Sequence, residues 1–181
     1  MNDLNLPTAD LFSTPAVPVV GPAWMPDDPK IRILGVEITD VTRTRAVQLI
    51  REMIDGYDGH SQSVFFTNAH TLNLGTANPD YRAVLNAGSY IFGDGIGVRW
   101  AARMKGIRLR DNVNGTDLVP ELLASTPGRR YFLLGSDDET IQRAAAMAEI
   151  RFPNWTQVGF HHGFLNDASL REEAIPRIDA A

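Results

Sequence analysis

The chain has 181 residues, a formal net charge of −5 and no cysteine, and its hydrophobic and charged residues make up 44% and 22% of the total. These values are ordinary for one globular domain, the acidic balance argues against a nucleic-acid-binding protein, and the lack of cysteine excludes disulfides, a thiol nucleophile and cysteine-bound zinc. The sequence has no apolar run of about 20 residues, as a membrane span requires, and its first residues lack the basic start and apolar stretch of a signal peptide, so we expect a cytoplasmic protein.

The first 30 residues are rich in proline and show no hydrophobic periodicity. Such a composition does not favour a packed core. We therefore expect residues 1–30 to form a disordered or loosely docked extension and residues 31–181 to form the ordered domain.

Strand-like and helix-like patterns then alternate along the chain. Residues 31–38 alternate in hydrophobicity like a strand, and residues 41–54 place apolar side chains at helical spacing behind a cap at Asp40 or Thr42. Residues 63–70 predict a short apolar strand with a polar end, and residues 78–88 predict a helix with Asn78 as N-cap and Pro79 at its first position. A third strand is predicted over residues 89–92 and another helix over residues 92–106.

The second half continues the alternation. Residues 115–125 predict a helix capped by Thr116, and residues 129–135 predict a buried strand. A helix with a capping box of Ser136 and Glu139 is predicted over residues 136–152, and a strand over residues 155–160. Alternation of this kind predicts an α/β fold with a mostly parallel sheet and helices on both faces. Ligands bind such sheets beyond the carboxyl ends of the strands.

Three polar clusters follow predicted strands: Thr67-Asn68-Ala69-His70, Gly93-Asp94-Gly95 and Gly135-Ser136-Asp137-Asp138. The first can hydrogen-bond a polar ligand or be an ordinary polar loop. Asp94 can be a general base or a nucleotide ligand, or a turn or N-cap residue. The Gly135 turn can bind an anion at a helix start or be an ordinary capped helix. From the residues alone, both alternatives stand for each cluster.

His161 and His162 follow another predicted strand. Neighbouring residues on a strand point to opposite faces, and no third ligand lies at a helpful spacing, so the pattern does not favour a metal site. A serine-histidine-aspartate triad is also poorly supported, because no Gly-x-Ser-x-Gly motif is present.

The segments "TNAHTLNLGTANPDYRAVLNAGSYIFGDGIGVRWAARMKG", "NGTDLVPELL", "YFLLGSDDETIQRAA" and "VGFHHGFL" occur in this order. From about Ile31 to Leu165 the chain resembles the WecG/TagA/CpsF family of bacterial glycosyltransferases. The resemblance implies a Rossmann-like α/β fold. It also implies inverting sugar transfer without a metal or other cofactor, from a UDP-sugar to an undecaprenyl-diphosphate-linked saccharide at the inner face of the cell membrane, where the protein would be peripheral.

The resemblance also implies roles for particular residues. Asp94 matches the family's general base, and Thr67 matches a threonine near the donor sugar. Residues that match segments lining the substrate sites are Asn68, His70, Gly93, Gly95, Asn112, Asn114, Gly135, Ser136, His162, Gly163 and Phe164.

Two departures from the family pattern qualify these expectations. Asn112 stands where the family often carries an arginine near the donor, so the resemblance leaves open an N-acetylmannosamine-type donor or glucose. The family also continues past "HHGF" with a helix, a strand, a "PKQE"-like motif and a basic tail, so we expect this chain to lack the family's C-terminal part. A non-catalytic nucleotide-sugar-binding form is therefore the alternative, and self-association of an incomplete sheet is an expected consequence.

Overall fold

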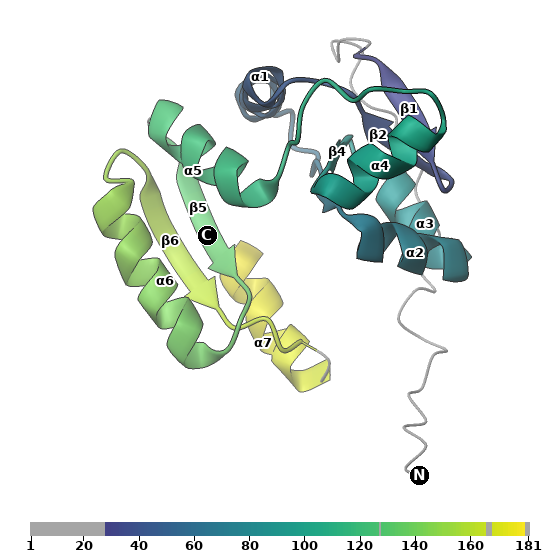
Figure 1. Cartoon of the computed structure of the whole chain (residues 1–181). Coiled ribbons are helices and arrows are strands. Elements are labelled where there is room, and N and C mark those ends of the chain that lie inside the picture. The colour runs from purple at the N-terminus through teal and green to yellow at the C-terminus, as the bar shows by residue number, and fades with distance from the viewer. Residues whose placement is uncertain (1–27, 127, 166–167, 180–181) are drawn as a thin grey trace. The chain divides into compact units, whose positions relative to one another are not determined.

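The computed structural model describes residues 28–126, 128–165 and 168–179. The chain divides into two compact units, Met1–Leu118 and Val119–Ala181 (Figure 1). The predicted extension falls almost entirely on residues 1–27, which lie outside the described residues. The first described strand begins at Lys30.

The first unit opens with a β-hairpin. Strands β1 (Lys30–Ile33) and β2 (Val36–Thr39) pair antiparallel, with Ile33 opposite Val36. The single strand predicted over residues 31–38 is therefore wrong. Leu34 and Gly35 both have positive φ, 48° and 85°, and two such residues form the tight turn that reverses a hairpin.

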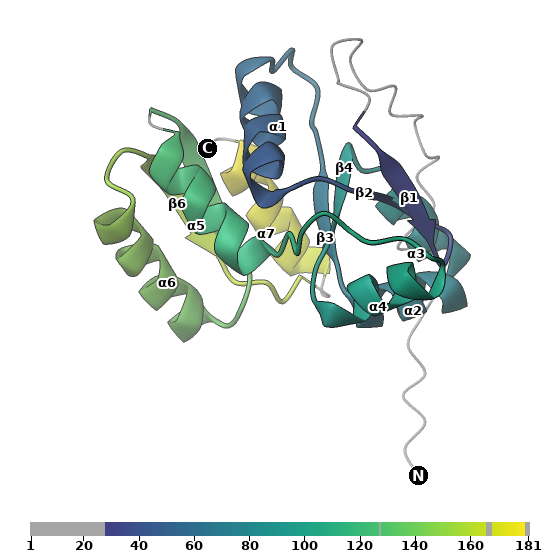
Figure 2. The ribbon, with the colours of Figure 1, turned by 45° about the horizontal axis from the view of Figure 1, so that its top comes forward.

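Two parallel strands form the centre of this unit. β3 (Val64–Thr67) and β4 (Tyr90–Gly93) pair in register, with Thr67 opposite Gly93 at their carboxyl ends. Helix α1 (Arg43–Asp55) has Thr42 as N-cap, one of the two caps predicted, and not Asp40. It lies on one side of this pair, and the two helices between β3 and β4 lie on the other (Figure 2).

Helix α2 (Ala69–Ala77) follows β3 directly, where a polar end to the strand was predicted. Asn68 is its N-cap, and the Asn68 and Thr71 side chains accept each other's backbone N–H groups. This reciprocal pair uses threonine in place of the usual glutamate or glutamine, so the sequence does not match the common pattern of a helix start. Helix α3 (Pro79–Asn86) begins behind Asn78, as predicted.

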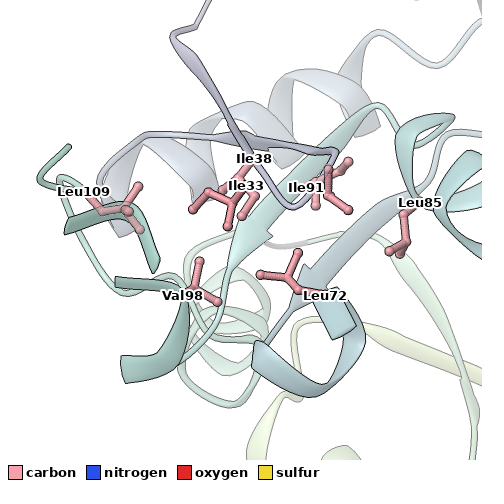
Figure 3. Close-up of a cluster of buried hydrophobic side chains, with 9 residues drawn as sticks. Ile33, Ile38, Leu72, Leu85, Ile91, Val98 and Leu109 are labelled. Carbon is pink, nitrogen blue, oxygen red and sulfur yellow. The ribbon is translucent and has the colours of Figure 1, made fainter. Parts of the chain in front are cut away.

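Helix α4 (Ile96–Met104) follows β4. Its buried residues Val98 and Ala102 join a core that draws on the hairpin, on β4 and on helices α2, α3 and α4 (Figure 3). The buried members of this core are Ile33, Val36, Ile38, Leu72, Leu85, Ile91, Val98, Ala102 and Leu109. At ~25 cal/mol per Å² of apolar surface removed from water, such packing is the main force that holds the hairpin against the parallel strands.

Helix α5 (Gly115–Ser125) leads to the second unit, where β5 (Arg130–Leu134) and β6 (Thr156–His161) pair in parallel. Helix α6 (Asp138–Arg151) packs on both strands, and α7 (Ala168–Asp179) packs on β6.

Two predicted caps in this part of the chain are wrong. Asn114, not Thr116, caps α5, because its Oδ1 accepts the N–H of Asp117 at 2.8 Å. Asp137, not Ser136, caps α6, and Ser136 instead takes a left-handed φ of 59°. In both places another side chain one or two residues away competes for the same backbone groups.

The predicted fold class is confirmed. The protein is α/β, with two parallel strand pairs separated by helices, consistent with a Rossmann-like fold.

Candidate active site

The turn after β4 is held by three hydrogen bonds from two other segments. The carbonyl of Gly93 accepts the N–H of Val113 at 3.1 Å, and the N–H of Asp94 reaches the carbonyl of Thr67 at 2.8 Å. The N–H of Gly95 donates to Oδ1 of Asn112 at 2.6 Å. Each residue of the Gly93-Asp94-Gly95 turn is thus fixed through its backbone.

The two outer residues of the turn are glycines for different reasons. Gly95 has a φ of 89°, which disfavours other residues. A Cβ atom on Gly93 would lie 3.1 Å from Val98 and 3.6 Å from Ile38, so a side chain there would press on the core.

Asp94 itself caps no helix and pairs with no charged residue in the part of the chain that the structure describes. The N-cap of α4 is Gly95, which makes no side-chain capping bond. Among the described residues, no hydrogen bond or ion pair to the Asp94 carboxylate is found, and the residue is half-buried. The backbone of the turn is therefore fixed, and the oxygens of the Asp94 carboxylate can accept a hydrogen bond or a proton from another group.

Thr67 lies beneath this turn. Its side chain is fully buried, and its hydroxyl donates to the carbonyl of Phe92 at 3.3 Å. Its own carbonyl holds the N–H of Asp94. The Thr67 hydroxyl thus links β3 to β4, and the Thr67 carbonyl fixes the backbone of Asp94.

The first turns of α2 and α4 meet beside Asp94. A Cβ atom built on Gly97 would lie 2.8 Å from the Cβ atom of Ala69, so the two helix starts are in contact. Helix starts carry unpaired N–H groups and the positive end of the helix dipole, and both favour an anion. His70, in the first turn of α2, is exposed.

Three predicted binding side chains of this unit make local hydrogen bonds. Asn68 caps α2, Asn114 caps α5, and the amide oxygen of Asn112 holds Gly95. Asn112 therefore reaches the site through the backbone of the turn that carries Asp94.

In the second unit, two glycine turns touch at the carboxyl ends of β5 and β6. A Cβ atom on Gly163 would lie 2.8 Å from the Cα atom of Gly135, and the N–H of Gly163 donates to the carbonyl of Ser136 at 2.8 Å. Asp137 accepts the N–H of Thr140 at 2.7 Å, and this bond lowers the pKa of the Asp137 carboxyl. A negative charge therefore already occupies the start of α6, which opposes an anion there.

The two histidines of the second unit have different environments. His161 is buried, and its Nδ1 lies 2.8 Å from the carbonyl of His162, so Nδ1 carries the proton. His162 is half-buried and accepts the N–H of Phe164 at Nδ1, while the Phe164 ring is 61% exposed. Gly135, Ser136, His162, Gly163 and Phe164 are thus neighbours at one end of this unit.

No cluster of three or more histidine, aspartate or glutamate side chains with metal-binding geometry is found among the described residues, and no described helix has the length and hydrophobicity to span a bilayer. A pocket of about 480 Å³ lies between α1 and the start of β3, at the other end of that strand from Thr67, and it is lined by Ile50, Met53, Ile54, Tyr57, Gln62 and Val64.

Comparison with known proteins shows the family to which this chain belongs. The model of the glycosyl transferase WecG/TagA/CpsF family matches residues 31–181. The chain belongs to this family. Its curated relatives include the N-acetylglucosaminyldiphosphoundecaprenol N-acetyl-beta-D-mannosaminyltransferases of Staphylococcus aureus strains NCTC 8325 and COL, each 28% identical over 148 residues. The match covers 81% of this chain and 57% of each relative, so the chain spans little more than half the length of the relatives that it matches.

For this WecG/TagA/CpsF-family chain, the predicted site residues form two groups. Eight of them lie in the first unit, in the turn after β4 or in the segments around residues 67–70 and 112–114 that hydrogen-bond to it: Thr67, Asn68, His70, Gly93, Asp94, Gly95, Asn112 and Asn114. The other five form the paired glycine turns of the second unit. The contact of Gly97 with Ala69 was missed, although the glycine at the start of a helical pattern in "GIGV" was a signal for a close approach.

Proposed function

We propose that this protein transfers a sugar from a UDP-sugar to an undecaprenyl-diphosphate-linked saccharide, in the assembly of a bacterial surface polysaccharide. Family membership supports the reaction class. The observation that carries the proposal is the half-buried Asp94 carboxylate, which has no partner among the described residues and stands on a turn fixed by three hydrogen bonds.

Asp94 is the general base of the proposed reaction. Its carboxylate takes the proton of the acceptor hydroxyl as that oxygen attacks the anomeric carbon of the donor. The new carbon–oxygen bond forms on the face opposite the bond to UDP, which breaks, so the configuration inverts. A fixed turn suits this role because a base must be held within hydrogen-bond reach of the proton that it removes.

The leaving UDP develops negative charge that the protein must stabilise. The first turns of α2 and α4, in contact at Gly97 and Ala69, offer backbone N–H groups beside Asp94. Fixed donors of this kind stabilise charge without reorganising during the reaction. We propose that they serve the donor diphosphate without a metal ion.

The activity for which the relatives are named favours N-acetylmannosamine as the transferred sugar and N-acetylglucosaminyl-diphosphoundecaprenol as the acceptor. Glucose is the competing donor, because Asn112 stands where the resemblance leads us to expect an arginine, and its amide oxygen is used by Gly95. The acceptor's lipid would place the protein at the inner face of the membrane as a peripheral protein.

A transfer assay tests the proposal. The chain is incubated with N-acetylglucosaminyl-diphosphoundecaprenol and either UDP-N-acetylmannosamine or UDP-glucose, with and without EDTA, and UDP release and the product mass are followed. We expect one donor to give a disaccharide of inverted configuration by NMR, at a rate that EDTA does not change. A product of retained configuration would contradict the mechanism, and loss of activity in EDTA would contradict metal independence.

The alternative is a nucleotide-sugar-binding protein without turnover. Calorimetry with both donors distinguishes the two. Binding of a UDP-sugar without UDP release, even when the C-terminal segment of a relative is supplied, would favour the binding protein over the enzyme.

A further inference from the structure

Helix α4 exposes an apolar stripe to solvent. Ile96, Trp100 and Met104 are 68%, 66% and 88% exposed. They recur every four residues and therefore lie on one side of the helix. Val98 and Ala102, on the opposite side, are fully buried in the core. Both sides of the helix are therefore apolar, but packing against the core accounts only for the side that carries Val98 and Ala102.

The stripe lies in a basic stretch of the sequence, between Asp94 and Asp111. Residues 96–110 contain five basic residues and no acidic one, although the whole chain has a net charge of −5. The five are Arg99, Arg103, Lys105, Arg108 and Arg110. Among the described residues none of them forms an ion pair, and four of them are exposed while Arg99 is half-buried. Ile107 and Leu109 pack against or within the core, which keeps Arg108 and Arg110 on the outside.

We propose that this surface, the α4 stripe with its five cations, binds the face of an anionic lipid bilayer. Tryptophan and aliphatic side chains on a helix that lies in the interface enter the boundary between headgroups and acyl chains, and lysine and arginine contact anionic headgroups around them. The α4 stripe supplies the apolar side chains that would enter this boundary, and the five cations would contact the anionic headgroups.

A second copy of the chain is the competing occupant of such a patch. A symmetric contact of α4 with α4 would bring the five cations of each copy together, with no carboxylate in residues 96–110 to pair with them. Such a contact places like charges beside one another, whereas an anionic bilayer neutralises them. Charge therefore favours the lipid surface.

The position of α4 connects this surface to the candidate site. The stripe begins at Ile96, two residues after Asp94. The inference rests on the proposed function in one respect, since that function supplies the reason for a membrane next to Asp94, where a lipid-linked acceptor would be presented. Binding to vesicles is measurable without any sugar transfer, so the two proposals can fail separately.

The first experiment measures sedimentation of the full chain with vesicles. We expect binding to phosphatidylcholine vesicles with 30% phosphatidylglycerol and little binding to phosphatidylcholine alone, with release at high salt. The triple substitution Ile96→Ser, Trp100→Ser and Met104→Ser should weaken binding at least tenfold. The matched control is Met147→Ser with Ile150→Ser, which removes exposed apolar side chains from α6 and should leave binding unchanged. Equal binding by the triple variant and the wild type would overturn the proposal.

The second experiment reports the environment of the stripe directly. Because the chain has no cysteine, Met104→Cys and the control Met147→Cys can each carry one environment-sensitive fluorophore. We expect a blue shift with anionic vesicles for the probe at position 104 and none at position 147. A probe at 104 that is already in an apolar environment without vesicles, or a dimer in light scattering that the triple serine substitution dissociates, would overturn the lipid assignment.

Discussion

Gly97 in the first turn of α4 lies against Ala69 in the first turn of α2, so closely that a Cβ atom on Gly97 would be 2.8 Å from the Cβ atom of Ala69. Real Cβ atoms essentially never approach to that distance, so one of the two helices would have to shift. The contact holds together the two helix starts that flank Asp94.

Gly97→Ala should destabilise the first unit. Alanine is favoured over glycine inside a helix by about 1 kcal/mol, but overpacking costs about 1–3 kcal/mol. We therefore expect the free energy of unfolding, measured by chemical denaturation, to fall by about 1 kcal/mol. Adding Ala69→Gly removes the clash and should restore most of the loss.

Gly75→Ala in α2 is the matched control for this pair. A Cβ atom there would meet its nearest neighbour at an ordinary 3.6 Å, so helix propensity should act alone and stabilise the protein by up to about 1 kcal/mol. If Gly97→Ala behaved like Gly75→Ala, the close contact would not exist in solution.

Asp94→Asn should abolish most of the proposed transfer. The amide keeps the size of the side chain but cannot take a proton, and removal of a general base costs about 10²–10⁴-fold in rate. UDP release in the presence of acceptor measures the effect, and donor affinity by calorimetry should change little. Asp80→Asn, at the exposed start of α3, is the control. A variant at Asp94 with near wild-type turnover would remove this residue from the mechanism.

Asn112→Ala should lower turnover through the turn that it holds. Its amide oxygen is the acceptor for the N–H of Gly95, and loss of one buried partner costs about 1–3 kcal/mol. We expect kcat to fall about tenfold with little change in KM for the donor, and amide exchange at Gly95 to accelerate. Asn112→Asp keeps an oxygen acceptor and should keep Gly95 protected. Weaker donor binding at unchanged kcat would instead mean that Asn112 contacts the substrate.

Leu34→Asn should stabilise the hairpin of β1 and β2. Leu34 has a φ of 48° and is 46% exposed, so its side chain gains little from burial and its backbone is strained. Asn-Gly is the preferred pair for a two-residue turn with positive φ at both positions. We expect a gain of about 0.5–1 kcal/mol in thermal or chemical unfolding, since the left-handed region costs ordinary residues roughly 1–2 kcal/mol. Leu34→Val, which is β-branched, should have the opposite effect.

Local patterns predicted the elements whose signals lie within them. The periodicity of residues 41–54 predicted α1, and Asn78 with Pro79 predicted the start of α3. The apolar runs that became β4 and β5 were also predicted. In the two helices the hydrophobic face and the cap indicate the same structure, and the tertiary contacts agree with both.

Predictions were wrong where two local signals competed. Leu34 was expected to continue a strand, but the chain reverses there because Gly35 completes a turn and the hairpin buries Ile33 and Val36 together. Ser136 and Thr116 were plausible caps, yet Asp137 and Asn114 hold the free N–H groups. A sequence pattern does not say which of several adjacent side chains reaches a helix start, because the backbone angles at that point decide it.

The sequence alone determined the α/β class, the order of most elements, the resemblance to the family and the choice of candidate residues, because hydrophobic periodicity, turn residues and motif order are local properties of the chain. Only the tertiary structure decided that Asn112 holds the turn of Asp94, that Thr67 supports it from below, that two helix starts meet at Gly97, and that the stripe on α4 faces solvent. These relationships join residues distant in sequence, or depend on which side of a helix the core covers. They exist only once the hairpin, the parallel strands and the helices have packed together.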